Sequence, residues 1–191
     1  MNRPEARECF SWSGLQEVIK SNELERLGRS NQCQDEYMEY MTKLTEDGWK
    51  TPSDYLLHHV FEYEFTTNKE DIVDGMVTPV NLILPHPSLP QPLGSGCPTI
   101  LKLKKNDYPY RFEPGIAHFC LWKLNGTITE EDLAFGENEL RELMMTANNE
   151  SSDVGDVSVV DICRFNNPPA LKSIKDIDHT HFMARWGITT L

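Results

Sequence analysis

The sequence predicts an α+β fold in which N-terminal helices pack on a mainly antiparallel sheet. Apolar residues recur at helical spacing through the first part of the chain, prolines and glycines concentrate at 85–98, and the second half alternates apolar runs with turn signals around one helical segment. We therefore expect a single α+β domain over 1–191. It comprises a helical part at 1–65, an irregular, proline-rich loop at 66–98, and a sheet with one helical crossover at 99–191.

Three helices are expected in the N-terminal part. Residues 12–24 and 37–44 repeat apolar side chains at the i, i+3, i+4 spacing of an amphipathic helix. Residues 51–54, Thr-Pro-Ser-Asp, combine a capping hydroxyl, a proline in the first turn and an acidic residue. They indicate a third helix from Asp54 to about Phe61. We expect these apolar and aromatic stripes to be packing surface rather than a ligand groove.

The second half predicts strands joined by one helix. The strongest strand signal is 116–124, IAHFCLWKL, because a nearly continuous apolar run is typical of a central strand. Further strands are expected at 80–84, 100–104, 157–165 and 177–186. A helix is expected from Thr129 to about Ala147, with a break at Gly136.

Charge restricts the classes of partner. The chain has 18 Lys and Arg against 30 Asp and Glu, a formal net charge of −12. Such a surface repels a phosphate backbone, so neither general nucleic-acid binding nor binding to an anionic membrane is expected. No apolar run reaches the ~18 residues of a membrane helix, and residues 1–10 lack the apolar stretch of a signal peptide. We expect a cytoplasmic protein, with the nucleus as the alternative, and the sequence predicts neither a cofactor nor an oligomeric state.

A histidine pair is the most informative feature for function. His179 and His181 are two residues apart in an expected strand, so both point to one face of the sheet, ~7 Å apart. Two imidazoles on one face can bind a phosphate, hold a metal, or divide into a nucleophile and a helper. His118 lies in the other strong strand, and the three histidines converge if the two strands are neighbours. The alternative is a pair that is partly exposed or bonded to backbone carbonyl groups.

Other polar residues are candidates because they lie beside the expected sheet. Four basic residues there can each neutralise a phosphate: Lys123, Arg164, Lys172 and Arg185. Asp107 lies in the turn before the strongest strand. The five cysteines form no CxxC pair, which argues against a zinc knuckle. A metal site built from the three histidines or a carboxylate is permitted by the spacing, but nothing selects it, so no metal ligand is assigned.

Several motifs together resemble the fungal N-acetylglucosamine-induced protein family. They are NDYPY at 106–110, GIAH at 115–118, LWK at 121–123, NPPALKS at 167–173 and DHTHFM at 178–183. The last two are the most specific, although Asp178 stands where we expect Glu. The resemblance spans Trp12 to Met183 and implies a cytosolic protein, since the members are largely uncharacterised cytosolic proteins.

A second resemblance, to the histidine-triad superfamily, bears on mechanism. A strand HFCLWKL, a helix, another strand, an asparagine and a strand with HxH follow one another as they do there. The resemblance implies that His181 attacks phosphorus, that His179 is the first histidine, and that Asn167 binds phosphate oxygens. Met183 occupies the place of the third histidine, and a thioether is only a weak hydrogen-bond acceptor.

These residues leave three functions open. The first is a phosphoryl- or nucleotidyl-transfer enzyme, hydrolase or transferase, acting on a nucleotide or sugar nucleotide. Its catalytic residues are His181 and His179, and its ligand-binding residues are His118, Asn167, Lys172, Arg185, Asp107 and Lys123. The second is a non-catalytic small-molecule-binding or regulatory protein on a degenerate scaffold, which Met183 favours. The third is a secondary-metabolism enzyme that transfers an acyl or aminoacyl group.

Overall fold

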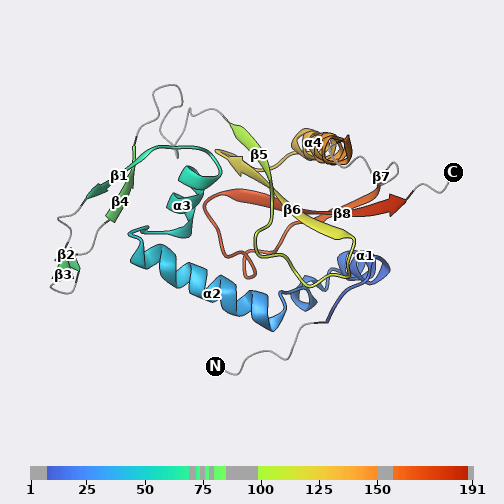
Figure 1. Cartoon of the computed structure of the whole chain (residues 1–191), viewed down its shortest axis with the longest axis horizontal. Helices are drawn as coiled ribbons and strands as arrows, with labels where there is room; N and C mark the ends of the chain where they lie inside the picture. Colours follow the sequence, from blue (N-terminus) through green and yellow to red (C-terminus); the bar gives the residue numbers. More distant parts are fainter. Residues whose placement is uncertain are drawn as a thin grey trace.

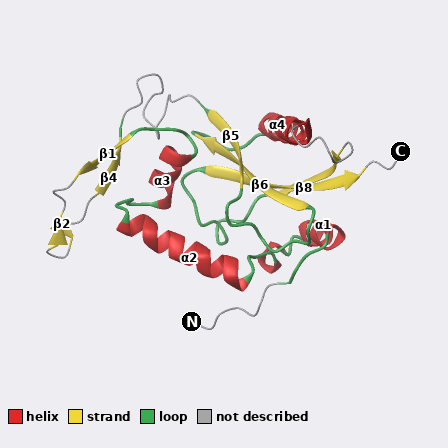
Figure 2. Cartoon of the chain, in the orientation of Figure 1, coloured by secondary structure: helices red, strands yellow, loops and turns green. Residues whose placement is uncertain are grey.

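An antiparallel sheet forms the centre of the molecule (Figures 1 and 2). The computed structural model describes residues 8–68, 72–73, 76–77, 80–84, 99–149 and 157–188. Within them, the sheet has the strand order β5-β6-β8-β7, and every neighbouring pair is antiparallel. The strands are β5 (Ile100–Lys105), β6 (Ile116–Leu124), β7 (Val157–Phe165) and β8 (Asp178–Ile188). The α+β prediction is confirmed.

Helices cover both faces of this sheet (Figure 1). On one side lie α1 (Trp12–Ser21), the 3₁₀ helix η1 (Leu24–Arg26), α2 (Asn31–Glu46) and α3 (Pro52–His59), and on the other lies α4 (Glu130–Asn149). Capping side chains start the first three α-helices: Ser11, Ser30 and Thr51 each accept a hydrogen bond from the backbone N–H three residues later. Among the described helices, none has the length and apolar character that a membrane span requires.

Two small two-stranded sheets follow α3 and extend from that end of the molecule. One pairs β1 (Phe65–Asn68) with β4 (Val80–Ile83), and the other pairs β2 (Ile72–Val73) with β3 (Met76–Val77). Asn81 explains part of this order, because its buried amide accepts from Thr67 Oγ1 at 2.9 Å and donates to the Asp47 carbonyl at 2.8 Å. The sequence predicts only the strand at 80–84 here, and the proline-rich stretch 85–98 lies outside the described residues.

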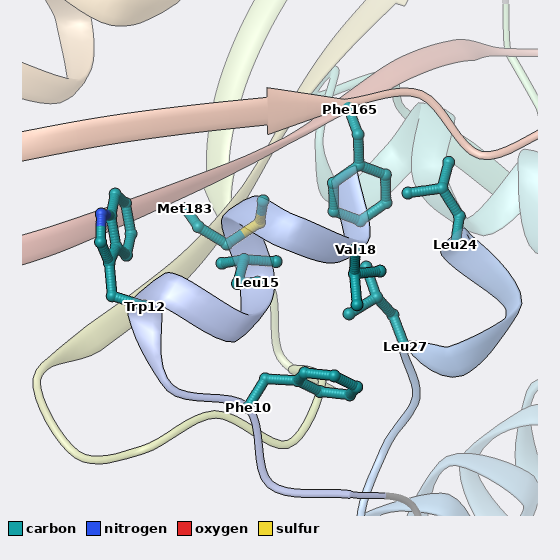
Figure 3. Close-up of a cluster of buried hydrophobic side chains, with 8 residues drawn as sticks. All are labelled: Phe10, Trp12, Leu15, Val18, Leu24, Leu27, Phe165 and Met183. Atoms are coloured by element: carbon teal, nitrogen blue, oxygen red, sulfur yellow. The ribbon is translucent and has the colours of Figure 1, made fainter. Parts of the chain in front are cut away.

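Alternating side chains along β6 and β8 fill hydrophobic cores on both faces of the sheet. Toward α4, the strand residues Phe119, Leu121 and Phe182 pack against Leu133 and Leu140. Toward α1, Met183 and Phe165 meet the buried residues of the N-terminal segment, as Figure 3 shows: Phe10, Trp12, Leu15, Val18, Leu24 and Leu27. Both faces of the sheet are therefore anchored by apolar contacts.

Helix α4 continues through Gly136, so the break predicted there is wrong. A Cβ atom at this position would lie 3.0 Å from Leu121 Cδ2 and 3.2 Å from Phe182 Cζ. Glycine lowers helix propensity by about 1 kcal/mol relative to alanine. Here the missing side chain lets the helix approach the sheet closely, and the resulting packing maintains the helix.

Substitution of a core residue on α1 should weaken the whole domain. Leu15 is fully buried between the N-terminal segment and the sheet, so we expect Leu15→Ala to lower the free energy of unfolding by about 2–5 kcal/mol. Urea denaturation followed by tryptophan fluorescence measures this loss. In the control Met38→Ala, on the exposed side of α2, the change should stay within about 0.5 kcal/mol; equal losses in both variants would contradict the assigned core.

Candidate functional site

The pairing of β6 with β8 brings three histidines together. In this register Trp122 lies opposite His179, Cys120 opposite His181, and His118 opposite Met183. The ring centroids of His118 and His181 are 5.1 Å apart, and those of His179 and His181 are 5.3 Å apart. All three imidazoles are buried on the sheet face that is turned toward the N-terminal helices.

A cavity of about 380 Å³ lies between this sheet face and the N-terminal helices. The strands contribute Cys120, Trp122, His179 and His181, and the helices and loops contribute many of the other lining residues, including Arg29, Tyr37, Tyr40, Tyr55, Tyr108 and Tyr110. The helical stripes are therefore not only packing surface, as expected above, because their tyrosines also line this cavity. It is large enough for a metabolite-sized ligand.

The hydrogen bonds around His118 and His181 define their tautomers. The backbone N–H of Tyr110 donates to His118 Nδ1 at 3.2 Å, so a neutral His118 carries its proton on Nε2. His118 Nε2 lies 2.9 Å from His181 Nδ1 and donates to it, which leaves the proton of His181 on Nε2. Asn167 Nδ2 lies 3.0 Å from that atom and 2.9 Å from the hydroxyl of Tyr110. Two N–H donors cannot face each other, so this tautomer of His181 requires the amide of Asn167 to be turned over, with its oxygen accepting the proton of His181 Nε2.

His179 has the opposite tautomer. Its Nδ1 lies 3.2 Å from the carbonyl oxygen of Ile177 and donates to it, so Nε2 carries an unprotonated lone pair. Among the described residues, Nε2 has no hydrogen-bond partner. The ring of Trp122 holds the imidazole from one side, with centroids 4.5 Å apart. His179 is thus the histidine of the pair with a free basic nitrogen at the cavity.

Burial keeps the three histidines neutral. It lowers the pKa of His118 to about 3, the pKa of His181 well below its ordinary value, and the pKa of His179. For His181, repulsion from His118 and His179 adds to this effect. Burial also raises the pKa of Cys120 to about 12, so its thiol is protonated at neutral pH. The site therefore presents neutral hydrogen-bonding groups and an imidazole lone pair at pH 7.

Three donor atoms lie close enough to bind a metal ion: His118 Nε2, Cys120 Sγ and His181 Nδ1 are all within 4.8 Å of one another. Metal binding through His118 Nε2 would require the proton on Nδ1, where it would face the N–H of Tyr110 that also points there. The hydrogen bonds therefore favour a relay from Tyr110 through the histidines to Asn167 over a set of metal ligands.

The structure brings some of the sequence candidates together and separates others. Asn167 contacts His181, and Asp107 lines the cavity. Lys123 instead points toward α4 and forms an almost buried ion pair with Asp132. Lys172 pairs with Asp178 at 2.7 Å, and Arg185 pairs with Asp161 at 2.6 Å while lying over the ring of Trp12. These three cations are thus bound to carboxylates and do not line the cavity.

Other residues that line the cavity were not predicted as site residues from the sequence. Arg29 precedes α2, Tyr108 belongs to the turn before β6, and Lys104 and Lys105 end β5. The turn signal around Tyr108 predicts a loop but not its contact with α2. No sequence pattern around Arg29 predicts a place in the cavity, because its position depends on how the loop between η1 and α2 folds back on the sheet.

Sequence comparisons identify a family and two fungal relatives of the chain. Residues 11–185 match a family described as protein of unknown function (DUF3605). The chain is 26% identical to N-acetylglucosamine-induced protein 1 of Candida albicans over 181 residues, which cover 92% of this chain and 68% of the relative. It is 25% identical to uncharacterized protein YPL067C of Saccharomyces cerevisiae over 182 residues, covering 94% of this chain and 80% of the relative. The resemblance to the fungal N-acetylglucosamine-induced proteins is confirmed.

The fold also resembles a solved structure. The crystal structure of HTC1 superimposes with a TM-score of 0.51 at 20% sequence identity, covering 92% of this chain and 85% of that chain. At this identity the similarity concerns the fold alone. The resemblance to the histidine-triad superfamily stays a prediction.

The tautomers are directly measurable. Long-range ¹H–¹⁵N correlation spectra of the imidazole rings at neutral pH should show Nδ1–H for His179 and Nε2–H for both His118 and His181, because of the partners described above. Single His→Gln variants assign the signals. Finding His181 with its proton on Nδ1 would contradict the relay.

Stability should depend on pH through the same histidines. Their folded-state pKa values lie below the unfolded value of about 6.5, so the unfolded chain takes up more protons as the pH falls. We expect the free energy of unfolding to decrease between about pH 7 and pH 5, by up to about 1.4 kcal/mol per pH unit for each such histidine. Urea denaturation measures the slope, and His118→Gln should make it shallower. A stability that does not change over this range would contradict the burial of neutral imidazoles.

Proposed function

Because the chain belongs to the DUF3605 family, a family of unknown function, we propose a function from the site itself: transfer of a phosphoryl or nucleotidyl group by the histidine pair. The observation that carries the proposal is the lone pair of His179 Nε2, which belongs to a neutral, oriented imidazole at a cavity of about 380 Å³. A neutral imidazole is an effective nucleophile toward phosphorus when its free nitrogen faces the substrate.

The two histidines have different roles in this proposal. His179 Nε2 attacks phosphorus, an N–P bond forms, and the P–O bond to the leaving group breaks with its electron pair passing to the leaving oxygen. The oxygen of water or of an acceptor hydroxyl then attacks phosphorus, the N–P bond breaks with its electron pair returning to His179 Nε2, and the proton of the attacking group passes to solvent. His181 keeps its two hydrogen-bond partners and orients Asn167 through its Nε2–H, and the Asn167 amide N–H supplies a hydrogen bond to a phosphoryl oxygen. This exchanges the roles that the histidine-triad resemblance implies, because both ring nitrogens of His181 are already engaged.

The proposed substrate is a nucleotide or sugar nucleotide, and the proposed location is the cytoplasm. Two features support this substrate class: the proposed attack of an imidazole on phosphorus, and the tyrosine side chains that line the cavity. The cytoplasmic location rests on the resemblance to a family of cytosolic proteins.

One observation favours a second candidate, transfer of an acyl or aminoacyl group. Met183, at the position of the third histidine in the triad, is fully buried among the residues of α1 and does not line the cavity. Without that third group, His179 is equally suited to act as a general base that takes a proton from an attacking amine or hydroxyl. In this reaction no covalent bond to His179 forms.

A covalent intermediate distinguishes the two reactions. With nucleoside diphosphates and sugar nucleotides as donors, intact-mass spectrometry without acid should detect a phosphoryl or nucleotidyl adduct on the wild type. His179→Gln should abolish the adduct, and His181→Asn should slow its formation by roughly 100-fold. His58→Gln is the matched control, because His58 bonds to the Tyr63 carbonyl away from the cavity.

Each result decides between the candidates. An adduct that survives in His179→Gln would refute His179 as the nucleophile. Turnover of acyl donors with no adduct at any stage would establish the second candidate instead. Stabilisation by nucleotides without turnover would leave the binding protein of the sequence analysis as the function.

A further inference from the structure

The cations that line the cavity form no ion pair with a described carboxylate. Six basic residues elsewhere form ion pairs: Arg26, Lys102, Lys123, Arg164, Lys172 and Arg185. Arg29 and Lys104 line the cavity, and no described carboxylate lies within ion-pair distance of them. Lys105 also borders the cavity, but it is opposite Phe119 in the sheet, so its side chain points to the face turned toward α4. Asp107 is the single acidic residue that lines the cavity in the described part of the chain. In a chain of net charge −12, this is a local region of positive charge.

Arg29 is held in place by groups that leave its charge available. Its guanidinium carbon lies 4.0 Å from the ring centroid of Tyr37 and 5.8 Å from that of Tyr110, and its Nε donates to the Tyr108 carbonyl at 3.0 Å. The two terminal amino groups have no hydrogen-bond partner among the described residues. They present the planar fork that binds two oxygens of a phosphate or carboxylate at once.

Tyrosine rings stand next to this cation. Tyr108 contacts Tyr37 with centroids 5.3 Å apart and Tyr40 with centroids 5.0 Å apart, and Tyr55 continues the series at 5.6 Å from Tyr40. All four line the cavity and form what we call the tyrosine wall. Burial raises the pKa values of Tyr40 and Tyr108, so their hydroxyl groups stay neutral. A flat ring of a ligand can stack or pack edge-on against such a wall.

We propose that Arg29, with Lys104, binds the phosphate of a ligand whose planar ring lies against the tyrosine wall. The ligand class is a nucleoside phosphate. The identification of this ligand as a substrate rests on the proposed function, whereas its binding does not. Arg29 is close enough to the histidines for its charge to help lower the pKa values of His118 and His181, so a phosphate held by Arg29 lies in the same electrostatic environment as the reacting groups.

Isothermal titration calorimetry with ADP, adenosine and inorganic phosphate tests the assignment. We expect the wild type to bind ADP with an affinity that falls as salt is added. Arg29→Gln should weaken ADP binding by at least about tenfold, and Lys104→Gln by roughly threefold. Arg29→Lys, which keeps the charge but loses the fork, should fall between the wild type and Arg29→Gln. Adenosine binding should change little in any of these variants.

Lys102→Gln is the matched control, because Lys102 lies on the same strand but pairs with Glu62. ADP binding should be unchanged in this variant. Equal affinity of ADP for the wild type and for a folded Arg29→Gln variant, or no binding of ADP to the wild type, would overturn the assignment. Binding of inorganic phosphate that is as strong as that of ADP would overturn the role of the tyrosine wall.

His179→Gln separates this inference from the proposed function. Its ADP affinity should match that of the wild type, although its adduct is lost. If Arg29 controls ADP binding while no turnover occurs in the wild type, the binding site stands and the proposed reaction fails. If turnover occurs and Arg29→Gln leaves KM unchanged, the reaction stands and the binding site fails.

Discussion

The antiparallel pairing of β6 with β8 is the constraint on which the fold and the candidate site both depend. Its register places His118 beside His181, and Trp122 beside His179, on one face of the sheet. A slip by one residue would turn both histidines of β8 toward α4 and move Phe182 to the cavity. The buried contacts of Phe119, Leu121 and Phe182 with α4 oppose that slip. The same apolar packing that stabilises the domain therefore positions the imidazoles.

The two histidines of β8 are both neutral, but their hydrogen bonds leave different ring nitrogens available. Desolvation disfavours protonation of both, so neither ring adds a charge to the interior. The partners of each ring then decide which nitrogen is free: His118 and Asn167 occupy both nitrogens of His181, whereas the Ile177 carbonyl leaves one nitrogen of His179 open. Neutral imidazoles are compatible with the nearby Arg29 cation, whereas two protonated imidazoles would be repelled by it.

The sequence predicts the parts that local patterns encode. The strand bounds 116–124 and 157–165 agree with the structure, because apolar runs end there at Asn-Gly and Asn-Asn-Pro-Pro. The period of two predicts that His179 and His181 share a face. The same period, applied from His118, already places Lys123 on the other face, where the structure has it. Arg29 was not predictable, because its approach depends on tertiary packing rather than on periodicity.

Gly136 has an effect that reaches beyond helix α4. A Cβ atom at this position would meet Leu121 and Phe182. Leu121 precedes Trp122 in β6, and Phe182 follows His181 in β8. Any larger side chain would force either the helix outward or these two strands inward. Because Trp122 and His181 are the chain neighbours of Leu121 and Phe182, a displacement of these strands would also displace the side chains of the cavity. The absence of a side chain at a position outside the cavity thus helps to hold the cavity's own residues in place.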